Sequence, residues 1–212
     1  MDLGKHFHAD RSALYLIASN LLTIFLAVYQ KWDLSEIMWI YWGQSVIIGY
    51  FNYRRILDLR QFSTSGFSIN NKPAEPTRKT QKSTANFFAI HYGFFHLIYM
   101  VFLVNQTKSI DRTSVLFIMV CTVMFLFNHR FSYLYNKERD MHRTPNIGTI
   151  MFFPYLRIIP MHLTIIIGQS FAKGSSKGLI LFLGLKTLAD LVMHMIEHAD
   201  ARKRDNEYAS NE

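Results

Sequence analysis

At least seven ionisable side chains lie inside the hydrophobic stretches of this 212-residue chain. They include His91, His96, His129, Arg157, His162, Lys186 and Asp190. Membrane helices avoid such residues, because placing Arg, Lys or Asp in hydrocarbon costs roughly 2.5–3.5 kcal/mol each on insertion scales. Seven of them in one small membrane protein therefore indicate a site and not a plain anchor.

Four histidines have the side-chain type and spacing of a metal site. His194 and His198 are four residues apart, so on a helix their imidazoles lie one turn apart and can chelate one ion. His91 and His129 would complete a set of three or four nitrogen ligands, which suits zinc or iron. The alternative is that His198 contacts lipid headgroups and the other histidines form hydrogen bonds between helices.

The remaining charged residues predict an anion site near these histidines. Arg157 keeps its charge, so it needs a counter-ion or an anionic ligand. Asp190 is its expected partner, but Lys186 can pair with the same carboxylate, which leaves a surplus positive charge. We expect Arg157, Lys186 and His96 to bind the anionic group of a substrate, with Asp190 as a catalytic base. A structural ion-pair network is the alternative.

Transmembrane helices are the elements that must position these residues. Of all residues, 50% are hydrophobic and 15% are aromatic. The apolar residues form blocks long enough to cross ~30 Å of hydrocarbon as helices. We expect an all-α polytopic membrane protein with one transmembrane domain over residues 1–200. Its six spans are predicted at about 13–30, 35–53, 87–104, 114–133, 148–168 and 178–198.

The basic residues predict the orientation of these spans. The net charge of +8 is concentrated in alternate loops, a pattern that encodes membrane topology and argues against nucleic acid as a partner. The polar loop 54–86 and the tail 201–212 are both rich in Lys and Arg, so we expect them and both termini to be cytoplasmic. Residues 62–84 have no helical or strand period and predict a mobile loop. The predicted location is the inner (plasma) membrane, with several crossings.

The polar residues fall into two layers when depth is counted at ~1.5 Å per residue from the cytoplasmic ends of the spans. The first layer, ~5–6 Å deep, contains His91, His129 and His194. The second layer, ~11–14 Å deep, contains Gln44, His96, Arg157 and Asp190. These shared depths predict one interior site. Each of the two prolines that bracket Arg157, Pro154 and Pro160, frees a backbone carbonyl one turn earlier and favours a kink.

Three stretches resemble a family of bacterial six-helix membrane proteins known only as a domain of unknown function. They are HYGFFH at 91–96, FPYLRIIPMHLTIIIG at 153–168 and LKTLADLVMHMIEH at 185–198. The resemblance covers nearly the whole chain and implies no activity. It places one constellation at the family's motif positions: His91, His96, Arg157, His162, Lys186, Asp190, His194 and His198. A weaker likeness to seven-helix zinc hydrolases of the ceramidase and progestin-receptor type rests on separated histidines, although the seventh span is missing and Ser45 is only a loose counterpart of their membrane serine.

The expected function is that of an integral membrane protein with a His-rich metal site in the cytoplasmic half of the bundle. An enzyme acting on a lipid or amphiphile is the expected activity, with a zinc or iron ion as cofactor. The alternative is a small proton-coupled transporter or anion carrier, because Lys186, Asp190 and His194 follow one another at four-residue steps. The expected partners are the lipid bilayer and a lipid or anionic amphiphile, and the sequence is compatible with an oligomer.

Overall fold

The computed structural model describes residues 33–107, 111–160, 162–163 and 178–192, together with positions 21, 24, 25, 28, 29 and 195. The fold is mostly helical, which confirms the helical part of the prediction. The chain divides into two compact units. One is Asp33–Ile158, and the other combines Met1–Trp32 with Ile159–Glu212. In the second unit, residues 178–192 form a helix.

The described part of the unit Asp33–Ile158 contains four helices, one hairpin, and further helical residues after residue 154. A capping side chain sets the start of each helix, because it accepts a hydrogen bond from a free N–H of the first turn. The capping residues are Asp33, Thr77, Asp111 and Asn146. The elements in chain order are α2 (Leu34–Asp58), β1 (Ser68–Ile69), β2 (Lys72–Pro73), α3 (Arg78–Gln106), α4 (Arg112–Met141) and α5 (Ile147–Phe152).

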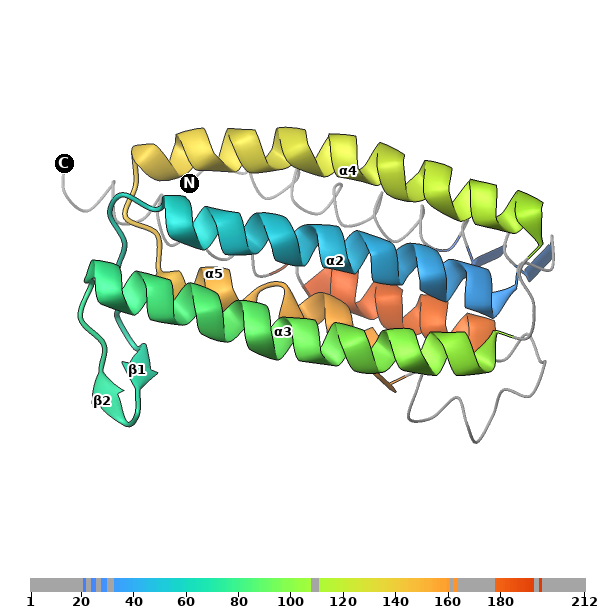
Figure 1. Ribbon diagram of the computed structural model, residues 1–212, viewed down its shortest axis with the longest axis horizontal. Helices are drawn as coiled ribbons and strands as arrows, with labels where there is room; N and C mark the ends of the chain where they lie inside the picture. Colours follow the sequence, from blue (N-terminus) through green and yellow to red (C-terminus); the bar gives the residue numbers. More distant parts are fainter. Residues whose placement is uncertain are drawn as a thin grey trace, which may run out of the picture. The chain divides into compact units, whose positions relative to one another are not determined.

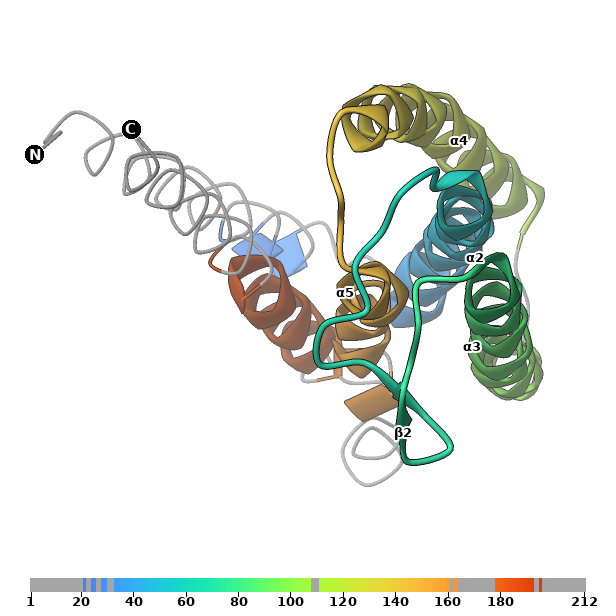
Figure 2. The same ribbon diagram turned by 90° about the vertical axis from the view of Figure 1, so that its left-hand side faces the viewer.

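Helix α2 lies between α3 and α4, and α5 packs against α2 and α3 (Figures 1 and 2). Small residues on α2 permit these close contacts. A Cβ atom at Gly49 would lie 2.5 Å from the Cε1 atom of Tyr92 on α3, and one at Gly43 would lie 3.1 Å from Oγ1 of Thr122 on α4. Side chains at these positions would push α2 away from its neighbours.

Two described helices, α3 and α4, are long and apolar enough to cross a membrane. They contain the predicted spans 87–104 and 114–133. Of the residues of α4, all of which the structure describes, only Asp140 is buried. The outer surface of both helices therefore consists largely of exposed apolar side chains.

The predicted polar loop 54–86 is folded at both of its ends. Helix α2 continues to Asp58 and α3 already begins at Arg78, so the connection between the helices is shorter than predicted. It contains the antiparallel hairpin β1–β2, whose turn residues Asn70 and Asn71 have positive φ angles of 51° and 61°. Asparagine tolerates this left-handed conformation better than most residues. Hydropathy marks where apolar residues end, whereas a helix continues as long as its backbone hydrogen bonds and caps allow.

Backbone hydrogen bonds join this connection to the one between α4 and α5. The N–H of Ser63 donates to the carbonyl of Pro145 at 2.9 Å, and the N–H of Ile147 donates to the carbonyl of Ser63 at 3.0 Å. The side-chain amide of Asn146 donates to the carbonyl of Ser65 at 2.8 Å. Both connections therefore lie at the same end of the unit, as the predicted alternation of spans requires.

Pro154 interrupts the helical structure that begins at Ile147, at a position where the sequence predicts a kink. Helix α5 ends at Phe152, and helical structure resumes over residues 155–160. In a continuous helix the carbonyl of Ile150 would accept from the N–H of residue 154, which proline lacks. The side-chain amide of Asn52 on α2 donates to this carbonyl at 3.1 Å. Asn52 thus replaces the hydrogen bond that Pro154 removes.

We predict that Asn52→Leu destabilises the protein by ~1–3 kcal/mol, because it leaves the carbonyl of Ile150 without a partner. Thermal unfolding in detergent measures the effect. Asn136→Leu is the control, since the Asn136 amide donates to the carbonyl of Ser132 within its own helix. In a Pro154→Ala background residue 154 regains an N–H, so Asn52→Leu should have much less effect. An equal loss in both backgrounds would contradict this account.

Candidate functional site

His91 and His129 lie on helices that flank α2 on opposite sides (Figures 1 and 2). His91 on α3 is exposed, and its Nδ1 atom is 2.9 Å from the hydroxyl of Tyr155. His129 on α4 stacks on Phe125 and contacts Phe51 of α2. The shared depth predicted from the sequence therefore does not place the two imidazoles around one point.

No group of three or more His, Cys, Asp or Glu side chains that could hold a metal ion occurs within the part of the chain that the structure describes. Two of the four predicted ligands, His194 and His198, lie outside the described residues. The metal site, with zinc or iron, therefore stays a prediction.

His96 belongs to a buried hydrogen-bond network between α2 and α3. Its Nδ1 atom is 2.8 Å from the carbonyl oxygen of Tyr92, so Nδ1 carries the proton and Nε2 accepts from the Ser45 hydroxyl at 2.9 Å. The Tyr92 hydroxyl lies 2.8 Å from the side-chain oxygen (Oγ) of Ser45. A Ser–His contact of this kind can activate a nucleophile, but Ser45, Tyr92 and His96 are 3%, 4% and 5% exposed.

The burial of this network indicates a packing role, because a reacting hydroxyl needs contact with its substrate. Both ring nitrogens of His96 already have protein partners. The network joins the helices at the level where Gly49 admits the Tyr92 ring. The role of His96 in binding a substrate stays a prediction, and in the structure its side chain forms a hydrogen bond to Ser45 of α2.

Arg157 is half-buried, and its guanidinium has no ion pair or hydrogen bond among the described residues. Only its backbone carbonyl is engaged, by the hydroxyl of Tyr41 on α2 at 2.8 Å. Its positive charge lies close enough to His129 and Tyr92 to act on both electrostatically. The arginine that the sequence predicted as an anion ligand is therefore available to a ligand within the unit Asp33–Ile158.

Gln44 of α2 is directed toward the same region. At 100° per residue it lies about 20° from Phe51 and about 60° from Tyr41 around the helix axis. Phe51 contacts His129, and Tyr41 contacts the backbone of Arg157. Neither Gln44 nor His129 makes a side-chain hydrogen bond in the described part of the chain. Three half-buried polar side chains from three helical segments thus have spare hydrogen-bonding capacity.

Lys186 and Asp190 form an ion pair in the other unit. The Lys186 Nζ atom is 2.7 Å from the Asp190 carboxylate, and the two residues are one helical turn apart. The predicted partner of Asp190 was Arg157, with Lys186 as the other candidate. The contact between Asp190 and Arg157 joins the two units and stays a prediction, as do the roles of Asp190 as a base and Lys186 as a substrate ligand.

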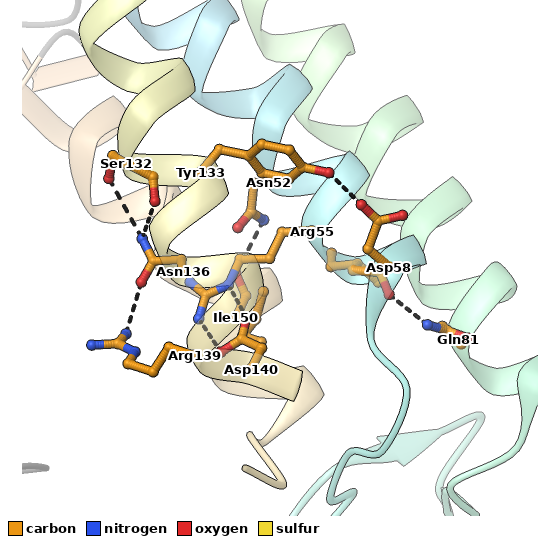
Figure 3. Close-up of polar contacts among 11 residues, drawn as sticks. Asn52, Arg55, Asp58, Gln81, Ser132, Tyr133, Asn136, Arg139, Asp140 and Ile150 are labelled. Atoms are coloured by element: carbon orange, nitrogen blue, oxygen red, sulfur yellow. Dashed lines mark hydrogen bonds and ion pairs between the residues drawn. The ribbon is translucent and has the colours of Figure 1, made fainter. Parts of the chain in front are cut away.

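A second group of polar residues fills the end of the unit where the basic connections meet (Figure 3). Arg55 of α2 binds Asp140 of α4 through two hydrogen bonds of 2.6 and 2.9 Å. The side chains of Arg55 and Asp140 are only 23% and 7% exposed. The sequence analysis used only the basic residues of the loops, as topology signals, and did not predict this pair, because nothing in the residue order shows which loop charges meet.

Asp58 accepts from both Tyr133 and Lys137 of α4. Partial burial alone would raise the pKa of Asp58, but the hydrogen bonds from Tyr133 and Lys137 outweigh it and hold the pKa below its usual value. The carboxylate is therefore charged at neutral pH.

Gln81 of α3 completes this end of the unit, because its amide donates to the carbonyls of Ile56, Leu57 and Leu59. These carbonyls belong to the last turn of α2 and its C-cap residue, where carbonyls have no partner within the helix.

The chain matches one protein family. A family described as "Family of unknown function (DUF6498)" matches over residues 3–207. No curated protein and no solved structure matches the chain.

We predict that Asp140→Asn destabilises the protein by about 3 kcal/mol, because the half-buried guanidinium of Arg55 loses its counter-charge. Glu138→Gln is the matched control, since Glu138 is an exposed acid on the same helix and should change the stability by less than ~0.5 kcal/mol. Chemical unfolding in detergent measures both variants. Arg55→Gln combined with Asp140→Asn should recover part of the loss. Equal effects of Asp140→Asn and Glu138→Gln would refute the pair's importance.

Proposed function

The chain belongs to a family of unknown function (DUF6498), and we propose that it is an integral membrane protein that binds the anionic group of a lipid or amphiphile within its helical bundle. The observation that carries this proposal is the guanidinium of Arg157. It is half-buried and has no counter-charge among the described residues.

The exposed apolar surface of α3 and α4 supports membrane embedding. A core helix of a soluble protein can be equally long and apolar, but its apolar residues are mostly buried. On α4, Phe117, Met124 and Phe131 are 56%, 67% and 72% exposed. Large contiguous apolar patches on a protein surface mark contact with lipid or with a partner.

We extend this proposal to six spans with both termini cytoplasmic in the inner (plasma) membrane. The support is the position of the basic residues. The connections that follow α2 and α4 lie at one end of the unit, and both carry an excess of Lys and Arg. Cytoplasmic loops are distinguished by this excess.

The side chains around Arg157 suit an oxyanion. A guanidinium can bind a carboxylate or a phosphate through two parallel hydrogen bonds. The amide of Gln44 and a ring nitrogen of His129 can add donors to the same anion. An unpaired guanidinium at membrane depth is costly, so a bound anion would offset part of that cost. The apolar exterior of the bundle favours an anion attached to a hydrocarbon chain.

An anion carrier would use the same residues. Flux of the bound anion across proteoliposomes would distinguish a carrier from a protein that only binds it. Such a carrier is the transport alternative predicted from the sequence, with Arg157 as the residue that binds the anion.

Metal binding is the second candidate function. The spacing of His194 and His198 favours it, together with the ring nitrogens of His129, which have no hydrogen bond to any residue that the structure describes. A zinc or iron ion held by His194 and His198 with one of His91 and His129, whose imidazoles lie on opposite sides of α2 (Figures 1 and 2), would acidify a bound water and polarise a substrate oxygen, with Asp190 as the base. Such an enzyme could use the Arg157 site to orient its anionic substrate.

We predict that the purified protein retains an anionic amphiphile that Arg157→Gln loses at least tenfold, because one guanidinium provides the charge that holds it. Negative-ion mass spectrometry of the extracted protein measures the ligand. Arg112→Gln, at the exposed start of α4, is the control and should retain it. Equal ligand content in all three proteins would rule the site out.

Asp190→Asn tests the competing explanation that Arg157 pairs with Asp190. Under that explanation Asp190→Asn destabilises the protein more than His162→Gln does, and adding Arg157→Gln recovers part of the loss. If the double variant is the sum of the single ones, Arg157 and Asp190 do not interact. Detergent melting curves provide the comparison.

We predict about one zinc or iron ion per purified chain if the histidines form a metal site. Elemental analysis should show that His91→Ala combined with His194→Ala lowers this content, whereas His6→Ala combined with His8→Ala does not. Substoichiometric metal in the wild type, or full occupancy in the first double variant, would refute metal binding.

A further inference from the structure

Asp58, Tyr133 and Lys137 form a group on α2 and α4, and each of these helices carries an arginine shortly before the group, Arg54 and Arg130. Arg54 is one turn before Asp58 on α2, and Arg130 precedes Tyr133 and Lys137 on α4 by one and two turns. Both arginines are exposed, and neither has an ion pair or hydrogen bond within the described part of the chain.

The charges at this position do not cancel. Arg54, Arg130 and Lys137 contribute three positive charges, and Asp58 contributes one negative charge, so three minus one leaves a surplus of two. Arg54 lies close enough to Asp58 and Lys137 to act on both electrostatically. The carboxylate is already occupied by Tyr133 and Lys137, which leaves the two arginines for an external anion.

An exposed apolar stripe continues from Arg130 along α4. Leu126, Val123 and Met119 lie within about 40° of Arg130 around the helix. Their side chains are 39%, 48% and 57% exposed. From Arg130 to Met119 the helix rises about 16 Å, which is close to half of the ~30 Å hydrocarbon thickness. The stripe therefore has the length of one leaflet.

We propose that Arg54 and Arg130 bind the phosphate of an acidic phospholipid whose acyl chain lies on this stripe. The proposal rests on the membrane embedding proposed above and not on the Arg157 site. The surplus of positive charge favours a headgroup with a net negative charge over the neutral headgroup of phosphatidylcholine. The apolar stripe favours a lipid over a free phosphate, because hydrocarbon contacts add to the electrostatic attraction.

Native mass spectrometry of the full chain tests this site in mixed micelles of phosphatidylcholine and phosphatidylglycerol. The wild type should retain phosphatidylglycerol in preference to phosphatidylcholine, and Arg54→Gln combined with Arg130→Gln should reduce this preference by roughly tenfold or more. Lys72→Gln combined with Lys79→Gln is the matched control, since it removes two exposed positive charges from the same end of the unit without altering the stripe. The control should keep the preference.

Three outcomes would overturn the proposal. An equal loss in both double variants would assign the preference to the general basic surface. Absence of any preference in the wild type would show that no such site exists, and displacement of the lipid by glycerol phosphate would show that the headgroup alone is recognised. Arg157→Gln should keep the preference for phosphatidylglycerol, so a failure of the proposed anion site at Arg157 can be distinguished from a failure of the lipid site at Arg54 and Arg130. Flotation of the protein with phosphatidylcholine vesicles tests the membrane embedding separately.

Discussion

A polar group inside an apolar bundle needs a hydrogen-bond partner, and this requirement accounts for the contacts along α2. Tyr41 donates to the carbonyl of Arg157, Ser45 joins the network of His96, and Asn52 donates to the carbonyl that Pro154 leaves free. The guanidinium of Arg157 does not meet this requirement, because no described residue forms a hydrogen bond or ion pair with it. Polar groups that the described residues satisfy therefore have a structural role, whereas Arg157 is a candidate for binding a ligand.

Hydropathy predicted the helical class and the long apolar helices because both depend on composition over many residues. It did not predict where α3 begins, since the first turns after Arg78 are polar and depend on the cap at Thr77. The hairpin β1–β2 was also missed, although the pair Asn70–Asn71 is a turn signal that could have been used. Helix ends and turns depend on single residues, which an average over a window conceals.

Residue counting gives a predicted depth for each site residue, but it does not give the direction of its side chain relative to the neighbouring helices. Counting residues put His91 and His129 at one level, yet their helices pack on opposite sides of α2. Gln44 was assigned to the layer of Arg157, and the geometry of α2 directs it to the same region. The partners Arg55 and Asp140 come from segments 85 positions apart, so only the folded chain shows that they meet. Pairing across such separations cannot be read from local spacing.

The backbone hydrogen bonds between Ser63 and the segment before α5 have a consequence for the order of folding. They close a loop that contains all of α3 and α4, so they cannot form until both helices have been synthesised and placed. Contacts between distant segments form late because loop closure must precede them. During synthesis, α2 and α3 can associate early through Tyr92, whereas the basic end of the unit stays open until the start of α5 arrives. The hydrogen bonds of Ser63 therefore form only after the helices α2 to α5 have assembled.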